Sequence, residues 1–225
     1  MTAAFLPEQD CGLCPRLAAF RDENRIKFPD KFNAPVPSFG PDDARLLIVG
    51  LAPGLRGANF TGRPFTGDYA GDLLYSTLLK YGFARGQYAA HPKDGLELVD
   101  CRISNAVKCV PPENKPTGQE IKTCNSFIGR EVGFLKNVSV ILALGRVAHE
   151  AALRALACRP ALYKFGHGST HPLPEGKTLI DSFHCSRYNT QTRRLTEEMF
   201  HAVFEEISGL PDSHNLHALY LTSRF

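Results

Sequence analysis

Four short apolar runs, separated by segments with helical spacing, constrain the fold more than any other feature of this chain. Their branched side chains are typical of strands buried on both faces. The runs cover residues 46–50, 102–110, 138–145 and 178–183. The helical patterns cover 72–81, 117–135, 147–156 and a stretch from about Thr196. Strands that alternate with helices run parallel, so the sequence predicts a three-layer α/β/α sandwich with a central four-stranded parallel sheet.

The remaining segments indicate one globular domain. The chain has 225 residues, and its contents of 43% hydrophobic and 22% charged residues exclude a largely disordered protein. Residues 1–40 are poor in apolar runs, so we expect an extension wrapped on the sandwich, and residues 210–225 form a C-terminal tail. The sequence lacks an apolar run near ~20 residues and a basic signal-peptide region, so we expect a cytoplasmic monomer with no membrane contact.

Three loops follow the carboxyl ends of the predicted strands, where parallel sheets bind their ligands. They cover residues 51–71, 105–116 and 184–192. The glycines between Gly62 and Gly71 let a backbone approach a ligand closely, and Phe65 offers a flat apolar face there. The sequence therefore predicts that the functional site lies where these three loops meet.

The cysteines indicate a second kind of site. Cys11 and Cys14 form a C-x2-C pair, and Cys109 and Cys124 form a wider pair separated by 14 residues. Four thiolates suit either tetrahedral zinc or a 4Fe–4S cluster, and spacing alone does not choose between them. Cys109 and Cys124 could also be ordinary buried cysteines.

The loop motifs and the cysteines occur in an order that resembles the uracil-DNA glycosylase superfamily. The motif segments are 50–54, 62–71, 101–112, 165–168 and 184–192. The best match is the type-b branch (family 5), which carries a 4Fe–4S cluster, and the resemblance runs from Cys11 to about Met199. It implies an α/β/α fold, excision of a deaminated base from DNA, and a 4Fe–4S cluster held by Cys11, Cys14, Cys109 and Cys124.

Two positions depart from the common superfamily motifs. Many members have a polar or acidic residue where this chain has Ala52; alanine is typical of the type-b branch and directs attention to Asp68. The last motif commonly begins His-Pro-Ser, whereas here Cys185 follows His184. A cysteine should stiffen that loop less than a proline. Ala52 and the type-b resemblance favour a substrate range that includes hypoxanthine or xanthine as well as uracil.

The resemblance implies a role for each of four loop residues, because a glycosylase flips its target nucleotide into a pocket. Phe65 would stack against the base, and Asn105 would read its O4 and N3–H edge. His184, as a neutral imidazole, would donate to O2 of the departing base. Asp68 would hold the attacking water or offset positive charge on the sugar.

Each of these roles has a structural alternative. Phe65 could be a core residue, Asn105 a turn residue at a strand end, His184 a structural histidine, and Asp68 an exposed residue that begins a helix. Three further residues complete the predicted base-binding set: Leu51, Ala52 and Asn189. The pocket motifs contain no obvious Schiff-base lysine, Lys108 being the nearest, so we expect a monofunctional enzyme that leaves an abasic site uncleaved.

Charge distribution indicates DNA contact, although the net charge of the chain is only +3. Residues 163–194 contain five basic residues against two acidic ones. The predicted DNA contacts are Arg187, Tyr188, His167 and Arg193, by insertion into the groove or by contact with phosphates. This segment could instead be a solvated charged loop, or His167 and His171 could bind a second metal.

A non-catalytic protein would account for part of the same pattern. An iron–sulfur or zinc DNA-binding or redox-sensing protein would use the same cysteines and basic loop, but would be indifferent to Phe65, Asn105 and His184. We favour the enzyme, and we expect the cluster to have a structural role.

Overall fold

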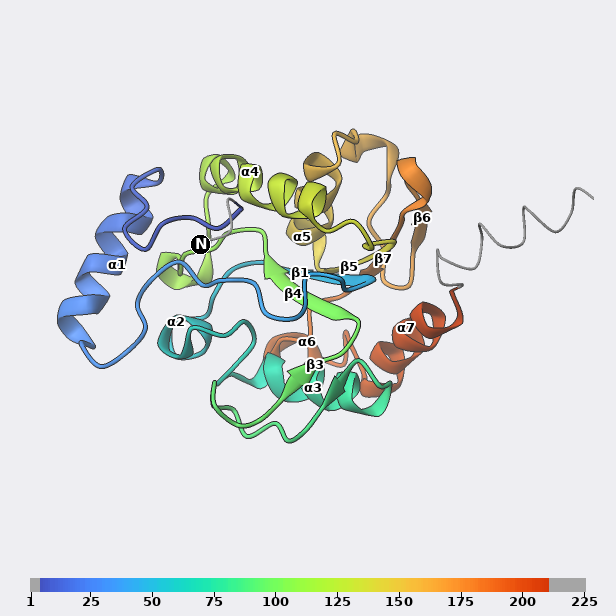
Figure 1. Ribbon diagram of the computed structural model, residues 1–225, viewed down its shortest axis with the longest axis horizontal. Coiled ribbons are helices and arrows are strands. Elements are labelled where there is room, and N and C mark those ends of the chain that lie inside the picture. The colour runs from blue at the N-terminus through green and yellow to red at the C-terminus, as the bar shows by residue number, and fades with distance from the viewer. Residues whose placement is uncertain (1–4, 211–225) are drawn as a thin grey trace, which may run out of the picture.

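The computed structural model describes residues 5–210, in which helices cover both faces of a central sheet (Figure 1). The helices are α1 (Pro15–Lys27), α2 (Ala58–Thr61), α3 (Tyr69–Lys80), α4 (Gly118–Phe134), α5 (Arg146–Ala155), α6 (Arg187–Gln191) and α7 (Glu197–Gly209). The strands are β1 (Leu46–Gly50), β2 (Ala84–Arg85), β3 (Glu97–Leu98), β4 (Cys101–Asn105), β5 (Val140–Leu144), β6 (Thr170–Pro172) and β7 (Thr178–Ser182). Helices α4 and α5 lie on one side of the sheet, with α3 and α7 on the other, which confirms the predicted α/β architecture.

Within the described residues the main sheet has five strands, in the order β4-β1-β5-β7-β6. The strands β4, β1, β5 and β7 pair in parallel, as the four apolar runs predict. The prediction of four strands needs one correction, because β6 adds an antiparallel strand to β7 at the edge. Its three residues, Thr-His-Pro, carry no apolar pattern that could have signalled a strand. A separate two-stranded sheet pairs β2 with β3.

Two apolar cores lie on opposite faces of the sheet. Along β1, Leu46 and Ile48 belong to the core shared with α3 and α7. Leu47 and Val49 belong to the core shared with α4 and α5. Successive strand side chains point to opposite faces, so a strand that is apolar throughout fills both cores.

One strand is shorter than predicted, and local hydrogen bonds explain where two of the helices begin. The strand predicted over 102–110 ends at Asn105, after which the chain turns and forms the loop that leads to Cys109. Helix α3 begins three residues earlier than predicted, because Asp68 accepts a hydrogen bond from the Gly71 N–H at its N-cap. Helix α4 begins with a reciprocal capping box between Thr117 and Glu120, as the sequence indicates.

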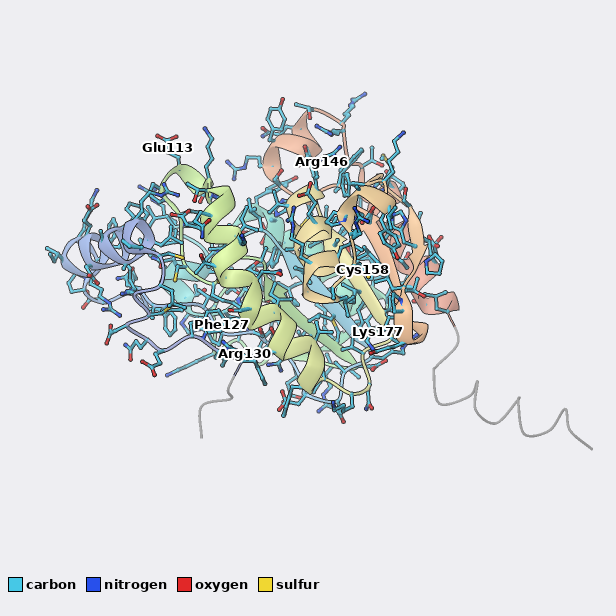
Figure 2. All side chains as sticks on the ribbon, turned by 90° about the horizontal axis from the view of Figure 1, so that it is seen from above. Glu113, Phe127, Arg130, Arg146, Cys158 and Lys177 are labelled. Carbon is cyan, nitrogen blue, oxygen red and sulfur yellow. The ribbon has the colours of Figure 1, made fainter. Side chains whose placement is uncertain are left out.

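The extension over 1–40 contains a helix, α1, that the sequence pattern did not reveal. Figure 2 shows α4 lying between α1 and α5. After α1 the chain runs along the free side of β4, where Phe39 and Ile103 exchange two backbone hydrogen bonds of 2.9 and 2.7 Å. Of the predicted tail, residues 211–225 lie outside the described part. Among the described residues, none of the helices has the length and apolarity needed to cross a membrane.

Candidate active site

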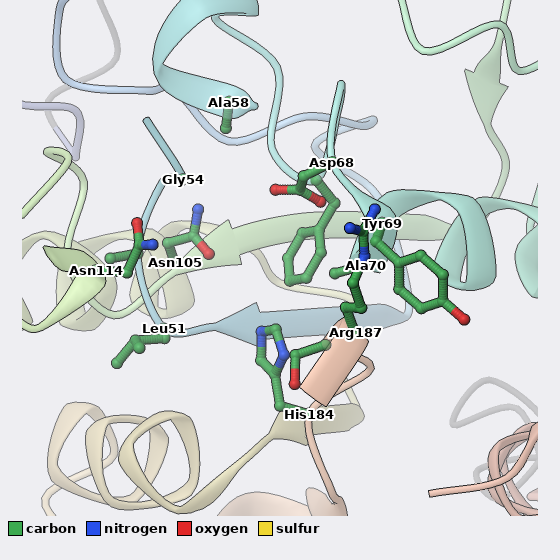
Figure 3. A pocket seen from close by; sticks show the side chains of 13 residues that line it. Leu51, Gly54, Ala58, Asp68, Tyr69, Ala70, Asn105, Asn114, His184 and Arg187 are labelled. Atoms are coloured by element: carbon green, nitrogen blue, oxygen red, sulfur yellow. The ribbon is translucent and has the colours of Figure 1, made fainter. Parts of the chain in front are cut away.

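A cavity of about 590 Å³ opens at the carboxyl ends of the parallel strands (Figure 3). Its size falls within the range of small-molecule sites. All three predicted loops contribute to its lining: Leu51, Ala52, Gly54, Ala58, Phe65, Asp68, Tyr69, Ala70, Asn105, Asn114, His184, Ser186 and Arg187. Figure 3 shows the side chains of Asp68, Asn105 and His184 directed into the same space.

Asn105 and Phe65 meet over the last residue of β1. A Cβ atom on Gly50 would lie only 2.4 Å from Asn105 Oδ1 and 2.6 Å from Phe65 Cζ, so a larger residue there would displace both. Asn105 is 3% exposed, and its side-chain amide makes no hydrogen bond to any described residue. The amide lines the cavity and is not among the polar atoms wholly cut off from solvent, so its donors and acceptor are open to a polar ligand.

Asp68 combines a structural contact with a place in the cavity wall. Its Oδ1 accepts the Gly71 N–H at 3.2 Å and so caps α3. Burial raises the pKa of the Asp68 carboxyl above its ordinary value. Asp68 can therefore cap α3 and face the cavity at the same time, because the cap uses only one carboxylate oxygen.

His184 follows β7 and faces Phe65, with the two ring centroids 5.9 Å apart and the planes inclined by 27°. Burial lowers the pKa of His184 to about 4, so its imidazole is neutral at pH 7. A neutral imidazole carries one N–H, which can donate a hydrogen bond to an oxygen that gains negative charge. The Asn189 side chain does not line the cavity; its Nδ2 donates to the backbone oxygen of His184 at 2.8 Å.

The four cysteines predicted as ligands lie together, in a pocket separate from the cavity. We call Cys11, Cys14, Cys109 and Cys124 the cysteine site. They border one small apolar pocket together with Leu17, Val107 and Phe127. All four are free thiols in this structure. The structure thus brings together two segments almost 100 residues apart in the sequence.

The electrostatics of the cysteine site suit a bound cationic group. Burial, with the charge of neighbouring sulfurs, raises the pKa of Cys14 to about 11 and that of Cys109 to about 12. Burial raises the pKa of Cys124 as well. Apolar surroundings therefore oppose four bare thiolates, and a metal centre is the kind of group that stabilises them in the deprotonated form. The donor set fits zinc or an iron–sulfur cluster.

The structure sets one limit on the distances between the four sulfurs. Four sulfurs around one zinc at about 2.3 Å would lie about 3.8 Å from one another. Of the described residues, the group of three or more metal-ligand atoms within 4.8 Å of one another is His149, His171 and Asp181, and it contains none of the cysteines. No three of the four cysteine sulfurs therefore lie within 4.8 Å of one another.

Comparison with known proteins places the chain in a family. The family description "Uracil DNA glycosylase superfamily" matches residues 37–208. The chain belongs to the uracil-DNA glycosylase superfamily. The "Type-5 uracil-DNA glycosylase" of Thermus thermophilus is 44% identical over 205 residues, which cover 89% of this chain and 93% of that protein.

Two further relatives of this superfamily member carry the same name. The type-5 protein of Mycobacterium bovis is 39% identical over 208 residues, covering 89% of this chain and 78% of its own. The type-5 protein of Pyrobaculum aerophilum is 36% identical over 193 residues, covering 84% of each chain. The chain therefore groups with the type-5 members of the superfamily, as the order of its motifs predicts.

The four residues predicted to contact DNA differ in their exposure. Arg187 lines the cavity rim with its guanidinium over the Tyr69 ring, 5.4 Å from the centroid. Tyr188 is 70% exposed beside it, and Arg193 is also exposed. His167 is turned inward: its Nδ1 accepts the Phe183 N–H at 3.2 Å, and burial lowers its pKa. Arg187, Tyr188 and Arg193 are thus surface candidates, while the half-buried His167 supports the loop before His184 through Nδ1, and its DNA contact stays a prediction.

Sequence reasoning missed some residues of the cavity wall, of which Asn114 is the most polar. It follows Glu113, and both have left-handed backbone angles, with φ of 57° and 55°. Its position inside the predicted 105–116 loop was the available signal. Tyr69 and Ala70 were missed because they belong to the first turn of α3, which the apolar pattern did not reach.

The structure also bears on the possible second metal site near His171. His149 Nδ1 lies 2.7 Å from one oxygen of Asp181, and His171 Nε2 lies 3.2 Å from the other. His149 Nε2 is 3.0 Å from the backbone oxygen of Tyr163. These polar atoms pair with one another, so hydrogen bonding alone accounts for the cluster, which joins α5, β6 and β7 just before His184.

Proposed function

We propose that this protein is a uracil-DNA glycosylase of base excision repair that hydrolyses the bond between a deaminated base and its deoxyribose. The observation that supports this most is the convergence of Phe65, Asn105, Asp68 and His184 on one cavity. They come from three loops, and the residue types match the needs of base excision: a stacking face, an amide, a carboxylate and a neutral hydrogen-bond donor.

Recognition requires the nucleotide to leave the helix, since the glycosidic bond is inaccessible in a stacked duplex. The flipped base would stack on Phe65 and pair its O4 and N3–H with the unpartnered Asn105 amide. A buried amide left unpaired is costly, so a base that lacks this edge is rejected. Backbone groups of Leu51 and Ala52 border the same space.

Cleavage transfers the electron pair of the C1′–N1 bond to the base, which leaves as an anion with charge on O2. The N–H of neutral His184 would donate to this oxygen and stabilise it. The sugar becomes cationic, and the Asp68 carboxylate would offset that charge while holding a water. The water oxygen then bonds to C1′, its proton passes to Asp68 or solvent, and the base anion takes a proton from solvent.

The absence of a suitable amine supports hydrolysis without strand cleavage. None of the residues that line the cavity in the described part of the chain is a lysine. The nearest candidate from the sequence, Lys108, has a fully buried side chain that pairs with Glu131 at 3.2 Å. A lysine held in this way cannot reach C1′ to form a Schiff base. A borohydride-trapped protein–DNA adduct would overturn this part of the proposal.

A 4Fe–4S cluster is the group we assign to the cysteine site. Cys11 and Cys14 from the N-terminal segment and Cys109 and Cys124 from the other side of the site would be its thiolate ligands. The cluster would supply a covalent link between these segments rather than redox chemistry in base excision. The apolar lining supports a bound centre, and the resemblance of the motifs to the cluster-carrying type-b branch supports a 4Fe–4S cluster over zinc. Iron and sulfide determination on protein purified without oxygen tests this assignment.

DNA contact belongs to the same proposal. Arg187 lines the cavity and the next residue, Tyr188, is exposed, so both would contact the strand from which the base is drawn. Each phosphate contact releases counterions, and affinity for DNA should therefore fall as salt is raised. Binding that is independent of salt would contradict this placement.

A single-turnover assay tests the activity itself. A duplex with one labelled uracil is incubated with excess protein and then treated with alkali, which cleaves abasic sites. We expect cleavage at the uracil, and parallel substrates with hypoxanthine and xanthine define the base range. Asn105→Ala and His184→Ala should each lose activity by at least ~100-fold while retaining DNA binding. An intact protein that leaves uracil in place would contradict the proposed function.

A further inference from the structure

The backbone of Phe65 is held in a conformation that a bulky residue rarely adopts. Its φ is 52°, in the left-handed region where side chains other than glycine are strained. Such a conformation persists only where the surroundings over-determine it, and it is found at ligand-binding sites. Because this ring is the proposed stacking face for the base, the contacts that hold the Phe65 backbone also fix the position of that face.

Three side chains hold the two peptide groups around Phe65. The Tyr75 hydroxyl donates to the oxygen of Pro64 at 2.6 Å, and the Tyr88 hydroxyl donates to the oxygen of Phe65 at 3.3 Å. Thr66 Oγ1 also donates to the Pro64 oxygen, at 3.2 Å, and accepts a hydrogen bond from Arg63 Nε at 2.7 Å. The loop thus depends on Arg63 having one orientation.

A residue from a distant segment sets that orientation. We call residues 84–98 the arm; it includes β2 and β3 and the turn between them. The two terminal guanidinium nitrogens of Arg63, Nη1 and Nη2, donate to the carboxylate of Asp94 in the arm, each at 2.8 Å. The two side chains are 5% and 1% exposed. A bidentate pair of this kind fixes the plane of the guanidinium as well as its position.

Further contacts hold Arg63 and Asp94 in this one orientation. Asp94 also accepts the N–H groups of Ala89 and Leu96, at 2.9 and 3.1 Å, which anchors its carboxylate to the arm. Its hydrogen bonds with Arg63 hold the pKa of Asp94 well below the ordinary value, so it stays charged. The Arg63 guanidinium lies between 5.2 and 5.8 Å from the ring centroids of Phe39, Tyr75 and Tyr88.

We propose that Asp94 is a positioning residue for base excision, which acts through Arg63 and Thr66 to hold Phe65 where it stacks on the flipped base. It touches neither base nor sugar. The inference rests on the proposed function and adds a specific task for the arm, whose residues do not line the cavity.

A double-mutant cycle separates this role from a general effect on folding. Single-turnover kcat/KM for uracil excision is measured for the wild type, Asp94→Asn, Phe65→Ala and the double variant. We expect Asp94→Asn to lower kcat/KM by about 10- to 100-fold in the wild type, because small misplacements of a positioning group have effects of this size. In the Phe65→Ala background the same substitution should change it by less than about twofold.

Binding to DNA that already contains an abasic site gives an independent readout. Such DNA has no base to stack, so Asp94→Asn should change its affinity by less than about twofold. If Asp94→Asn proves too unstable to purify, Thr66→Val removes the Arg63–Thr66 hydrogen bond together with the one from Thr66 Oγ1 to the Pro64 oxygen, and it should show the same dependence on Phe65. Glu97→Gln, at an exposed ion pair with Arg85 on the arm, is the matched control and should leave activity unchanged.

The outcomes are distinguishable. Equal losses from Asp94→Asn in the wild-type and Phe65→Ala backgrounds, with an active wild type, would overturn the positioning role and leave the proposed function intact. A wild-type protein that releases no uracil would overturn both. A marked loss of affinity for abasic DNA would also contradict the role, because it would show that the arm acts on DNA rather than on Phe65.

Discussion

Two regions of this molecule support loops of the same cavity by different physical means. The cysteine site supports the loop that begins at Asn105, and its side chains are surrounded mainly by apolar groups, with hydrogen bonds from the Lys108 N–H to Cys124 Sγ at 3.3 Å and from Arg21 Nη1 to the Cys11 oxygen at 2.9 Å. The arm supports the loop that carries Phe65, through a buried ion pair and directional hydrogen bonds. The arm is complete with protein groups alone, whereas the cysteine site is proposed to hold a bound cationic centre.

This difference predicts which substitutions should destabilise the protein most. A polar support made by side chains forms whenever the chain folds, and one altered residue disturbs it locally. A support made of four thiols in an apolar pocket depends on a group that the chain does not encode, and its loss frees two segments together. The following predictions test this contrast, beginning with the largest expected effect.

Cys11→Ser should destabilise the protein most. Removal of one ligand from a metal site belongs to the few changes that cost more than ~4 kcal/mol, because the whole centre is lost with it. Thermal unfolding followed by circular dichroism measures the change, and uracil excision should be lost in parallel. Cys158→Ser, at a half-buried cysteine outside the site, is the control. Equal stability of wild type and Cys11→Ser would show that the site holds no centre.

Gly71→Ala should lower activity much more than stability, because it displaces the loop that carries Phe65. A Cβ atom there would come within 1.8 Å of the Phe65 backbone oxygen, so the loop must move. We expect kcat/KM to fall by about 100-fold, as for a displacement of about 1 Å in a catalytic site, with a smaller change in Tm than Cys11→Ser causes. Gly133→Ala, on α4 where a new Cβ meets no atom within 4 Å, provides the control. Unchanged excision by Gly71→Ala would remove Phe65 from the mechanism.

The pH dependence of excision should reflect Asp68 and not His184. The pKa of Asp68 is raised by burial, so as pH falls its charge is lost at a higher pH than that of an ordinary carboxyl. We expect kcat/KM to fall about tenfold per pH unit below that point. The pKa of His184 is lowered to about 4, so the profile should show no inflection near pH 6.5. Asp68→Asn should abolish the acid limb; a limb that persists would assign it to another group.

Glu120→Gln should have the smallest effect and so sharpen the account of the cysteine site. Glu120 caps α4 and pairs with Arg16 on α1 at 2.7 Å, which makes it a second link between the segments that carry the cysteines. If the cluster is the main link, the substitution costs about 1 kcal/mol, as for a weakened cap, and the iron content is unchanged. Urea denaturation and iron analysis measure these quantities. Loss of iron would show that the ion pair holds the site together.

The sequence predicted the features that repeat a local pattern or a motif. The four parallel strands follow from apolar runs such as Leu46–Gly50, and the capping box of α4 follows from Thr117 and Glu120. Phe65, Asn105, Asp68 and His184 were found through motif order at strand ends, and the structure places all four at one cavity.

The features that escaped prediction depend on contacts between distant segments. Asp94 lies 31 residues from Arg63, and no local pattern announces that the two side chains meet. Strand β6 forms only because β7 offers it an edge, and Asn114 reaches the cavity through two successive left-handed residues. Asn189 lies in the right motif, but its amide is taken up by the His184 backbone, a distinction of a few ångströms that sequence spacing does not resolve.

The ends of the sheet have a consequence for association between copies of the chain. At one edge, Phe39 occupies the outward hydrogen-bonding groups of Ile103 on β4. At the other, β6 is three residues long and ends in Pro172, which has no N–H to donate. Neither edge presents a long row of free backbone groups onto which a further strand could add. Both edges thus discourage aggregation by strand addition, and they agree with the expectation of a monomer, which sedimentation of the purified protein can test.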